Sequence, residues 1–336
     1  MSTIGPGSEA LVSIDSNLLG IASTPYRTVI APSQDLERLS PADGLCLADC
    51  RSHAPVFAGM VVAAASRHYV PSRALSVRAL LQLPRLARTD GVVSRRRVIA
   101  ELNHCAARLR HDQQSLSELI PRDEYGLSDL RFVGLESAVA DRIFGRLHYL
   151  RSARAGSMNF ALVDPLNRLP VTLCSVSPLE WKRVGRQLRT QFGIPLEGAW
   201  DVSRVYSFDV APANAISYLL GRVRQWIRRE LPTAQVLTTA VDPNLGFTGS
   251  SYRSANWQKW MSIAARPYLY VDGLYATPRQ LRARFGDANL SHLRATHSEH
   301  RFEQSRARLL NSAIFCSRLR GETEQVAPAD CRVLRR

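Results

Sequence analysis

The sequence is almost devoid of lysine and short of acidic residues. Its 44 basic residues include two lysines, Lys182 and Lys259, which leaves 42 arginines. Only 29 aspartates and glutamates oppose them, so the formal net charge is +15. A GC-rich genome explains the arginine bias as well as selection does, but it does not explain the shortage of acidic residues. A charge of this size favours polyanionic partners, with nucleic acid first and an anionic cofactor second.

Long hydrophobic segments are missing too. The longest apolar run, residues 56–65, falls short of the roughly 20 residues that a membrane-spanning helix requires. The first residues have neither the basic nor the apolar part of a signal peptide. Six cysteines are scattered along the chain, which indicates reduced thiols. These features predict a cytoplasmic protein without a membrane partner.

One short cysteine and histidine cluster has a spacing compatible with a metal ion. It consists of Cys46, Cys50 and His53. The sequence shows no obvious second half of a ligand set. A structural role is therefore favoured for these residues, and no metal is predicted.

The length of the chain, 336 residues, suggests two domains. Residues 1–35, rich in serine, proline and glycine, predict an irregular leader. Residues 36–125 predict a helical N-terminal domain that ends at the break of pattern near Ile120. Apolar residues at steps of three and four predict its helices over residues 54–69, 76–83 and 94–116.

Residues 126–288 alternate between helical and strand patterns, and residues 289–336 predict a polar, basic C-terminal extension. The predicted strands cover residues 158–163, 169–175, 202–210, 236–241, 262–265 and 269–271. The predicted helices cover residues 128–150, a segment opened by Pro212 and closed by Pro232, and residues 250–260 and 279–285, with irregular chain over 178–200. This order predicts an α/β fold with a mixed central sheet flanked by helices, which fits the acetyltransferase fold of the GNAT superfamily.

The stretch from Gln235 to Trp260 concentrates residue types that build sites. A buried strand ends at Asp242, where an Asp-Pro-Asn sequence favours a turn. Glycines at 246 and 249 then admit close approach of the backbone, and Tyr252 begins the predicted helix. Sites on α/β sheets are often built in this way. An ordinary strand–turn–helix unit is the competing interpretation.

Three segments follow one another in an order found in a known family. They are residues 201–207 (DVSRVYS), the helix from Pro212 and residues 241–257 (VDPNLGFTGSSYRSANW). The pattern resembles the Mom family of phage DNA-modification proteins, a divergent branch of the GNAT superfamily, over about residues 130–286. His148-Tyr149 matches the family's early His-Tyr pair. The end of the last segment is also similar to Druantia-type anti-phage defence proteins, so the resemblance implies a fold and a site more firmly than a substrate.

The resemblance implies an active site of four residues. The implied catalytic residues are His148, Arg204, Asp242 and Tyr252. The implied reaction adds a carbamoylmethyl-type group to the exocyclic amine of adenine in DNA, from acetyl-CoA or a related acyl donor. Phe247 stands where the family usually has a histidine. The usual phosphate loop of the superfamily is also missing, which weakens the case for coenzyme A.

Acyl transfer to an amine needs a base, a polarised donor carbonyl and an acid for the leaving group. Tyr252 suits the acid, and Asp242 or His148 suits the base. Arg204 could pair with Asp242 or hold a phosphate or carboxylate. A buried structural ion pair and a structural histidine are the alternatives.

A donor pyrophosphate is expected at the N-terminus of the helix after Pro212, because free amides and the helix dipole attract anions there. The candidate cofactor-binding residues are Val210, Asn214 and Ser217.

An acceptor base in duplex DNA must leave the stack before it can react. The candidate substrate-binding residues are Asn256, Trp257 and Trp260, with Tyr268 as a further aromatic candidate. Core packing is the alternative explanation for at least one of these aromatic side chains.

Three functions remain open from the sequence. The first is a Mom-like transferase that modifies a nucleic-acid base, with adenine in DNA as the acceptor. The second is a GNAT-fold acyl or aminoacyl transferase that acts on a small-molecule, protein or tRNA-linked amine. The third is a non-catalytic nucleic-acid-binding subunit of an anti-phage defence system. Retention of all four catalytic candidates favours an enzyme, whereas Phe247 and the missing phosphate loop favour the third function.

Overall fold

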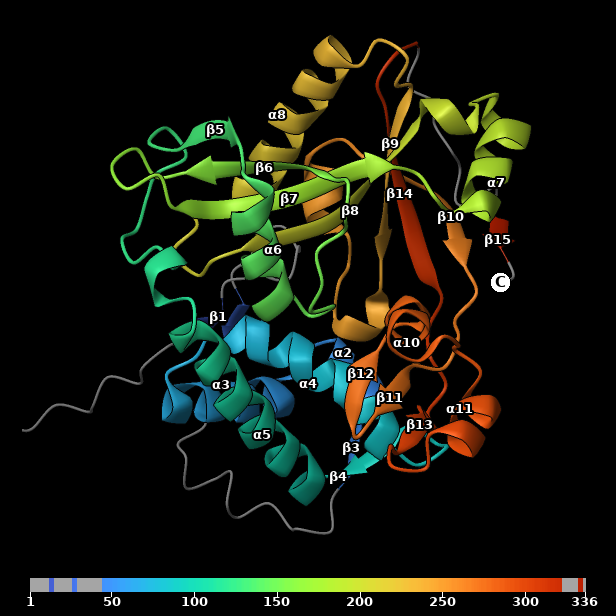
Figure 1. The fold of residues 1–336 in the computed structure, drawn as a ribbon. Helices are drawn as coiled ribbons and strands as arrows, with labels where there is room; N and C mark the ends of the chain where they lie inside the picture. Colours follow the sequence, from blue (N-terminus) through green and yellow to red (C-terminus); the bar gives the residue numbers. More distant parts are fainter. Residues whose placement is uncertain (1–11, 15–25, 29–43, 322–331, 335–336) are drawn as a thin grey trace, which may run out of the picture.

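The computed structural model describes residues 12–14, 26–28, 44–321 and 332–334 (Figure 1). Most of the leader predicted over residues 1–35, and the last two arginines, lie outside the described residues. Within the leader, β1 (Val12–Ile14) and β2 (Tyr26–Thr28) pair as antiparallel strands.

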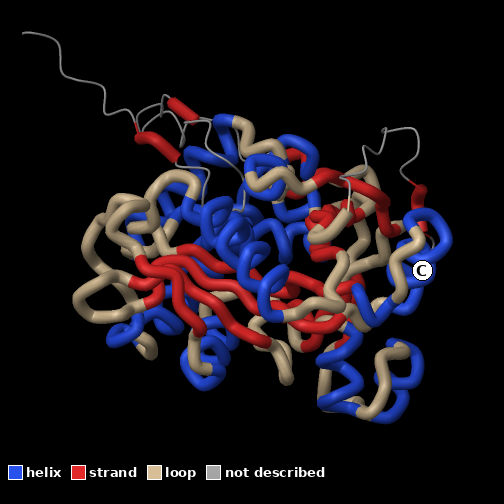
Figure 2. The backbone as a smooth tube through the Cα atoms, turned by 90° about the horizontal axis from the view of Figure 1, so that it is seen from above, coloured by secondary structure: helices blue, strands red, loops and turns tan. Residues whose placement is uncertain are grey.

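An eight-stranded sheet, in the order β15-β10-β14-β9-β8-β7-β6-β5, forms the centre of the molecule. β8 is parallel to β9 and β10 to β15, and the other neighbours are antiparallel. Helices lie on both sides of this band of strands (Figure 2). The predicted α/β fold with a mixed central sheet flanked by helices is therefore confirmed. The strands are β5 (Arg131–Gly134), β6 (Met158–Val163), β7 (Pro170–Pro178), β8 (Ala199–Ser207), β9 (Val236–Val241), β10 (Gln258–Ile263), β14 (Ser312–Arg318) and β15 (Arg332–Leu334).

Two hydrophobic cores sandwich the sheet. On one side its residues share a core with α3 (Pro55–His68), α4 (Ser72–Leu86), α5 (Arg95–Gln114) and α6 (Ser137–Arg146). On the other side α8 (Ala215–Glu230) buries an apolar stripe that includes Leu219 and Val223. The α3–α5 helices thus pack on the sheet through a common core, and the domain boundary near residue 125 stays a prediction.

A smaller three-stranded sheet lies against the N-terminal helices. Its order is β12-β11-β13, and the Tyr270 hydroxyl of β11 donates to the Leu81 carbonyl of α4 at 2.9 Å. The remaining elements are β3 (Gly44–Cys46), α2 (Leu47–Arg51), β4 (Val92–Ser94), α7 (Lys182–Phe192), α9 (Ser250–Ser254), β11 (Leu269–Val271), β12 (Leu274–Ala276), α10 (Pro278–Phe285), α11 (Leu290–Thr296) and β13 (Phe302–Gln304).

Elements with a strong local signal are confirmed close to their predicted bounds. β9 and β11 match the predicted strands residue for residue, and β6 and β7 lie at two further predicted strands and pair with each other as an antiparallel hairpin. α3 and α5 match the predicted N-terminal helices. Thr277 caps α10, because its hydroxyl accepts the Gln280 amide while the Gln280 side chain accepts the Thr277 amide.

The predicted helix over residues 128–150 is wrong in its first third. Residues 131–134 instead form β5, which pairs with β6 at the edge of the sheet, and α6 begins only at Ser137. The segment over 178–200, expected to be irregular, contains α7, which buries Val184 and Leu188. In both places pairing or packing with distant segments decided the local structure.

The predicted helix over residues 250–260 is also wrong in its second half. α9 ends at Ser254, and Asn256 adopts a left-handed conformation with φ of 61° that a continuing helix does not allow. β10 then starts at Gln258 and pairs with β14.

β14 is the largest surprise, because residues after 288 were expected to form only a polar extension. Its buried side chains Ile314, Phe315 and Cys316 lie in the sheet between β9 and β10. Arginine-rich chain flanks the strand, which hid its pattern.

Candidate active site

The candidate site is built where two parallel strands separate. β8 and β9 pair only over residues 199–201 and 236–238, although both strands continue beyond these residues. Past the fork, the Thr239 hydroxyl donates to the Val202 carbonyl at 2.9 Å and so satisfies a backbone acceptor that the missing ladder leaves free. The separation opens the sheet to a ligand from the side.

A β-bulge at Ser203 changes how the β8 side chains point. Val202 and Arg204 pair with consecutive residues of β7, so Ser203 is the extra residue. Side chains therefore do not alternate strictly between the two faces of the sheet along β8. Val202 and Val205 both pack in the core with α8, whereas Tyr206 packs in the core with the N-terminal helices.

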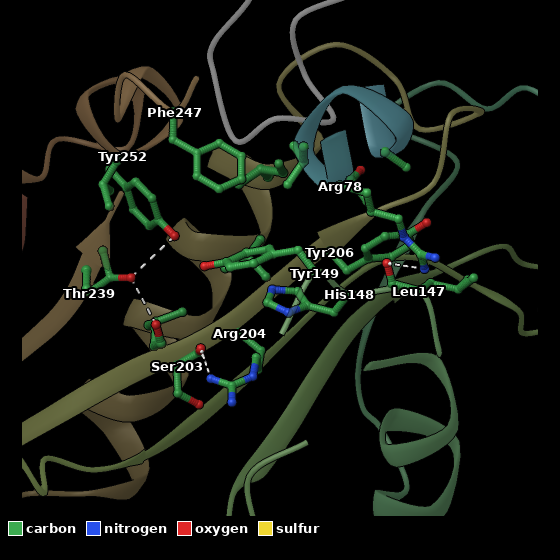
Figure 3. Close-up of a pocket in the computed structure, with 18 of the residues that line it drawn as sticks. Arg78, Leu147, His148, Tyr149, Ser203, Arg204, Tyr206, Thr239, Phe247 and Tyr252 are labelled. Atoms are coloured by element: carbon green, nitrogen blue, oxygen red, sulfur yellow. Dashed lines mark hydrogen bonds between the residues drawn. The ribbon is translucent and has the colours of Figure 1, made fainter. Parts of the chain in front are cut away.

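A cavity of about 90 Å³ occupies the fork (Figure 3). Its walls come from β8, β9, the turn after α6, the start of α8 and α4. Three of the four predicted catalytic residues line it, namely His148, Arg204 and Tyr252. Asp242 is not part of the lining.

His148 presents a neutral imidazole to the cavity. Its Nδ1 accepts the Leu150 backbone amide at 3.2 Å, so the neutral ring carries its proton on Nε2. Burial, and then the positive charges of Arg204 and Arg78, hold the pKa of His148 well below its ordinary value. The ring therefore offers the cavity a hydrogen-bond donor rather than the base that the sequence suggested.

Tyr149 packs between two other rings at the cavity wall, with both ring pairs tilted. Its ring centroid lies 4.4 Å from that of His148 and 5.8 Å from that of Phe247. Burial and the negative charge of Asp242 raise the pKa of Tyr149, so its hydroxyl stays protonated. Phe247, in place of the usual family histidine, thus serves as an apolar support for Tyr149.

Arg204 is held by oxygen acceptors close to it. Its Nε donates to the Ser152 carbonyl at 2.9 Å, its Nη1 to the Ser203 carbonyl at 2.6 Å, and its Nη2 to the Ser152 hydroxyl at 3.2 Å. Among the described residues it forms no ion pair with Asp242, so the structure does not support that one of the two alternatives for Arg204. Arg204 places a fixed positive charge beside His148 and Tyr149.

The Asp242 carboxylate is occupied by bonds that hold a turn. Its Oδ1 accepts the backbone amide and the side-chain amide of Asn244 at 2.9 and 2.8 Å, and its Oδ2 accepts the Tyr268 hydroxyl. Asn244 in turn exchanges hydrogen bonds with the backbone of Leu310 at 2.9 and 2.8 Å. These contacts favour a structural role for Asp242 over a catalytic one.

The glycines of this stretch have the role that the sequence predicted. Gly246 and Gly249 adopt left-handed conformations, with φ of 80° and 76°. A Cβ atom at Gly246 would collide with His53, and one at Gly249 would collide with the Phe315 ring. Close approach of the backbone therefore brings Tyr252 to the cavity.

Tyr252 points its hydroxyl into the cavity from the start of α9 (Figure 3). The oxygen lies 3.4 Å from the Thr239 hydroxyl, which is also bonded to β8. Its ring packs against Trp257 and Phe315. Burial raises the pKa of Tyr252 to about 12, so the group keeps the proton that a general acid must give.

The predicted cofactor residues lie near the start of α8, and Ile216 of its first turn lines the cavity. Asn214 is exposed at the N-cap, in a left-handed conformation, and its side chain makes no capping bond. Ser217 already donates to the Ser251 carbonyl at 3.3 Å. Val210 is half-buried between the two main cores. The helix start and Asn214 are thus available for an anionic group, whereas Ser217 is less so.

The predicted substrate-binding tryptophans are core residues, which corrects their assignment. Trp257 is 2% exposed and packs on Tyr252. Trp260 is 1% exposed and stacks on Phe192 of α7, in a core on a different part of the sheet. Asn256 is exposed in the turn before β10. Tyr268 is buried and holds Asp242.

Arg78 of α4 is a site residue that the sequence analysis missed. Its Nη2 donates to the Arg146 carbonyl at 2.6 Å and its Nη1 to Asp112 at 2.7 Å. It thereby fixes the end of α6, from which His148 projects. Arg78 is three residues from both Leu75 and Leu81, which places it on the buried face of this helix. This spacing was the signal in the sequence that could have identified Arg78.

The sequence analysis also missed two aspartates, one in β8 and one just after it. Asp209, just after the strand, lines the cavity. Asp201, at the fork, accepts bonds from Thr238 at 3.1 Å and from Arg154 at 3.2 Å. Burial raises the pKa of Asp201 to about 6, although Arg154 and the Thr238 hydrogen bond oppose the shift. Asp201 therefore titrates near neutral pH.

The described residues contain no group of three or more histidines, cysteines or acidic residues placed to hold a metal ion. Among the described helices, none is long and apolar enough to cross a membrane.

Comparison with known proteins identifies a family. No curated protein matches the chain. Solved structures with a similar arrangement include the Salmonella typhimurium protein yncA, assigned as an acetyltransferase and solved with its cofactor acetyl-CoA. It is 12% identical, with a TM-score of 0.33, over 59% of this chain and 98% of its own. An aminoglycoside N(6')acetyltransferase from Legionella pneumophila is 7% identical, with a TM-score of 0.29, over 57% and 92%.

The family match is to the part of the chain that holds the fork. A model of the Mom protein family matches residues 129–310, which is more than half of the 336 residues. The matched region contains β8, β9 and the turn with Tyr252. The chain belongs to the Mom protein family.

Proposed function

We propose that this protein is a transferase that moves an acyl-type group from an activated donor to the exocyclic amine of a nucleic-acid base, with adenine in DNA as the acceptor. Membership of the Mom family supports the acceptor class. The observation that carries the proposal is the Tyr252 hydroxyl, which keeps its proton and faces the same cavity as the neutral His148.

The transfer requires a new bond from the amine nitrogen to the donor carbonyl carbon. Charge then develops on the carbonyl oxygen, and the Nε2–H of His148 is a donor suited to that oxygen. The bond from carbon to the leaving group breaks, and Tyr252 gives its proton to the leaving group. A proton from solvent finally restores the Tyr252 hydroxyl, which balances the proton that the amine loses.

The amine proton needs a temporary acceptor. Among the described residues that line the cavity, Asp209 is the carboxylic acid. It replaces Asp242 in this role, because Asp209 lines the cavity and Asp242 does not. Asp209 lies at the exposed end of β8, where it can pass the proton to solvent.

An anionic donor would be held at the start of α8. The first amides of this 16-residue helix and the side chain of Asn214 are suited to a phosphate. When bound, a thioester donor supplies the activated carbonyl. Ile216 and Val202 provide an apolar wall beside the carbonyl position, which excludes water from the reacting group.

The test is mass spectrometry of nucleosides from DNA and RNA of cells that express the wild-type chain, Tyr252→Phe or Tyr69→Phe. We expect a new adenosine derivative in DNA with the wild type and a loss of roughly 100- to 10,000-fold with Tyr252→Phe, as for removal of a general acid. Tyr69→Phe removes an exposed hydroxyl and should leave the product unchanged.

Two results would redirect the proposal. A modified base in RNA alone would move the acceptor to RNA. No new nucleoside in either nucleic acid, with folded wild-type protein, would contradict the proposed acceptor class.

A further inference from the structure

A second, larger hollow lies beside the cavity. It has a volume of about 510 Å³ and runs between α4 and α5 on one side and β11, β12 and α10 on the other. We call it the arginine cleft. Arg78 and Tyr149 line both the cleft and the cavity, so the two hollows meet at these side chains.

The arginines in and next to the wall of the arginine cleft outnumber the carboxylates that pair with them. Arg78 and Arg151 each donate to Asp112 at 2.7 Å, and Arg146 lies 4.0 Å from the same carboxylate. Burial raises the pKa of Asp112, but the bonds from Arg151 and Arg78 outweigh it, so Asp112 stays ionised. One carboxylate therefore opposes three guanidinium groups before Arg108 is counted.

Arg108 is the free cation of this group. Among the described residues it makes no hydrogen bond or ion pair, although it is half-buried in the cleft wall. Burial, and then the charge of Arg151, lower the pKa of Arg108, which shows that the site disfavours the bare cation. An anion in the cleft would offset this cost.

The cleft also carries groups suited to a base. Gln82 is 8% exposed, lines the cleft, and its Oε1 has no hydrogen-bond partner among the described residues. Tyr275 and Phe285 are half-buried aromatic side chains of the opposite wall. Asp272, the acid in the lining, already accepts from His300 at 2.8 Å and from the Arg301 amide at 2.9 Å.

We propose that the arginine cleft binds the nucleic-acid strand next to the nucleotide that enters the cavity. The phosphodiester contacts Arg108 and Arg151, and the neighbouring base packs near Tyr275 and Phe285 with its edge at Gln82. This inference rests on the proposed function, because it takes the acceptor to be a polynucleotide. α4 and α5 lie outside the family-matched residues 129–310, so this chain's own N-terminal helices supply half of the strand-binding site.

Binding of a labelled single-stranded oligonucleotide, as DNA and as RNA of the same sequence, tests the cleft by fluorescence anisotropy over a range of salt concentrations. The full chain is compared with Arg108→Gln, Arg108→Lys and Arg96→Gln. Arg96 is an exposed arginine of the same helix, about 18 Å from Arg108 along its axis.

We expect Arg108→Gln to raise Kd several-fold and to reduce the salt dependence by about 0.7 of a counterion. Arg108→Lys should keep most of the salt dependence, and Arg96→Gln should resemble the wild type. Equal effects of Arg108→Gln and Arg96→Gln would overturn the proposal. Tighter binding of RNA with the same Arg108 dependence would assign the strand to RNA.

The cleft and the reaction can fail separately. Arg108-dependent binding without any modified nucleoside supports the cleft and contradicts the proposed reaction. A modified base that is formed at the wild-type rate by Arg108→Gln, with unchanged binding, supports the reaction and contradicts the cleft. Gln82→Leu is a further variant, expected to weaken preference among flanking bases while the salt dependence stays the same.

Discussion

The two hollows that meet at Arg78 and Tyr149 differ in size and chemistry. The cavity is about 90 Å³, and most of its wall comes from the family-matched region, with α4 closing one part and with rings and hydroxyl groups in its lining. The arginine cleft is about 510 Å³, carries arginines, and takes one wall from helices outside that region. The difference fits the proposed division of work, with group transfer in the cavity and strand recognition in the arginine cleft.

Burial acts differently in the two places. In the cavity it favours the neutral form of the titratable rings, so His148 is a neutral imidazole and Tyr252 keeps its proton. In the cleft the arginines stay charged because their ordinary pKa is far above neutrality. The cavity therefore suits directed hydrogen bonds and proton transfer, and the cleft suits attraction of phosphates.

The largest effect is expected from Arg78→Met, because Arg78 belongs to both hollows. The change leaves Asp112 with one fewer partner and frees the carbonyl groups at the end of α6. We expect the free energy of unfolding to fall by about 2–4 kcal/mol, with loss of both strand binding and base modification. Urea unfolding measures the stability change.

Arg108→Gln is the matched comparison for this prediction, since it also removes one arginine from the cleft but breaks no hydrogen bond with a described residue. It should change stability by less than about 1 kcal/mol. Similar urea midpoints for Arg78→Met and the wild type would contradict the stabilising role assigned to the Arg78 hydrogen bonds.

A smaller loss of stability is expected from changes at Asp242, which is not part of the cavity lining. Asp242→Ala removes the acceptor for Asn244 and Tyr268 and should cost about 1–2 kcal/mol of unfolding free energy. Asp242→Asn keeps an oxygen for the Asn244 amide and should retain both stability and most of the base modification. A folded Asp242→Asn variant without modification would restore Asp242 to the catalytic set and contradict the assignment of Asp209.

The smallest effect is expected in the pH dependence of stability. Burial holds the pKa of His148 well below its ordinary value and that of His53 at about 4. Below about pH 6.5 the unfolded chain thus binds more protons at these histidines than the folded chain does. The free energy of unfolding therefore decreases as the pH is lowered. Asp201 acts in the opposite direction between about pH 6 and 4, because its folded pKa of about 6 exceeds its ordinary value of 3.8.

Asp201→Asn removes this opposing contribution. Its unfolding free energy should fall more steeply with acidification between pH 6 and 4, by at most about 1.4 kcal/mol per pH unit. Urea titrations at pH 7, 6, 5 and 4 provide the measurement. The same slope in variant and wild type would mean that Asp201 does not titrate in this range.

The sequence predicted elements whose signal is local. The β9 strand and the α3 and α5 helices depend on residues close together in the sequence, and all are confirmed. It also identified Tyr252 as a candidate acid, and the structure brings its hydroxyl into the same cavity as His148 and Arg204. The catalytic roles of these residues stay predictions.

The sequence could not predict features that depend on partners far along the chain. β14 is a strand because it pairs with β9 and β10, and Trp257 and Trp260 are core residues because they pack in two different cores, on Tyr252 and on Phe192.

By itself, the sequence determined the mixed α/β fold, the turn at Asp242 and the positive charge, because hydrophobic spacing, turn chemistry and charge are properties of short segments or of composition. Only the tertiary structure decided that β8 and β9 separate after three paired residues and that Arg78 lines two hollows. It also decided that the Asp242 carboxylate bonds to the turn and does not pair with Arg204. These outcomes depend on burial and on hydrogen bonds between distant segments, whose energies no local pattern contains.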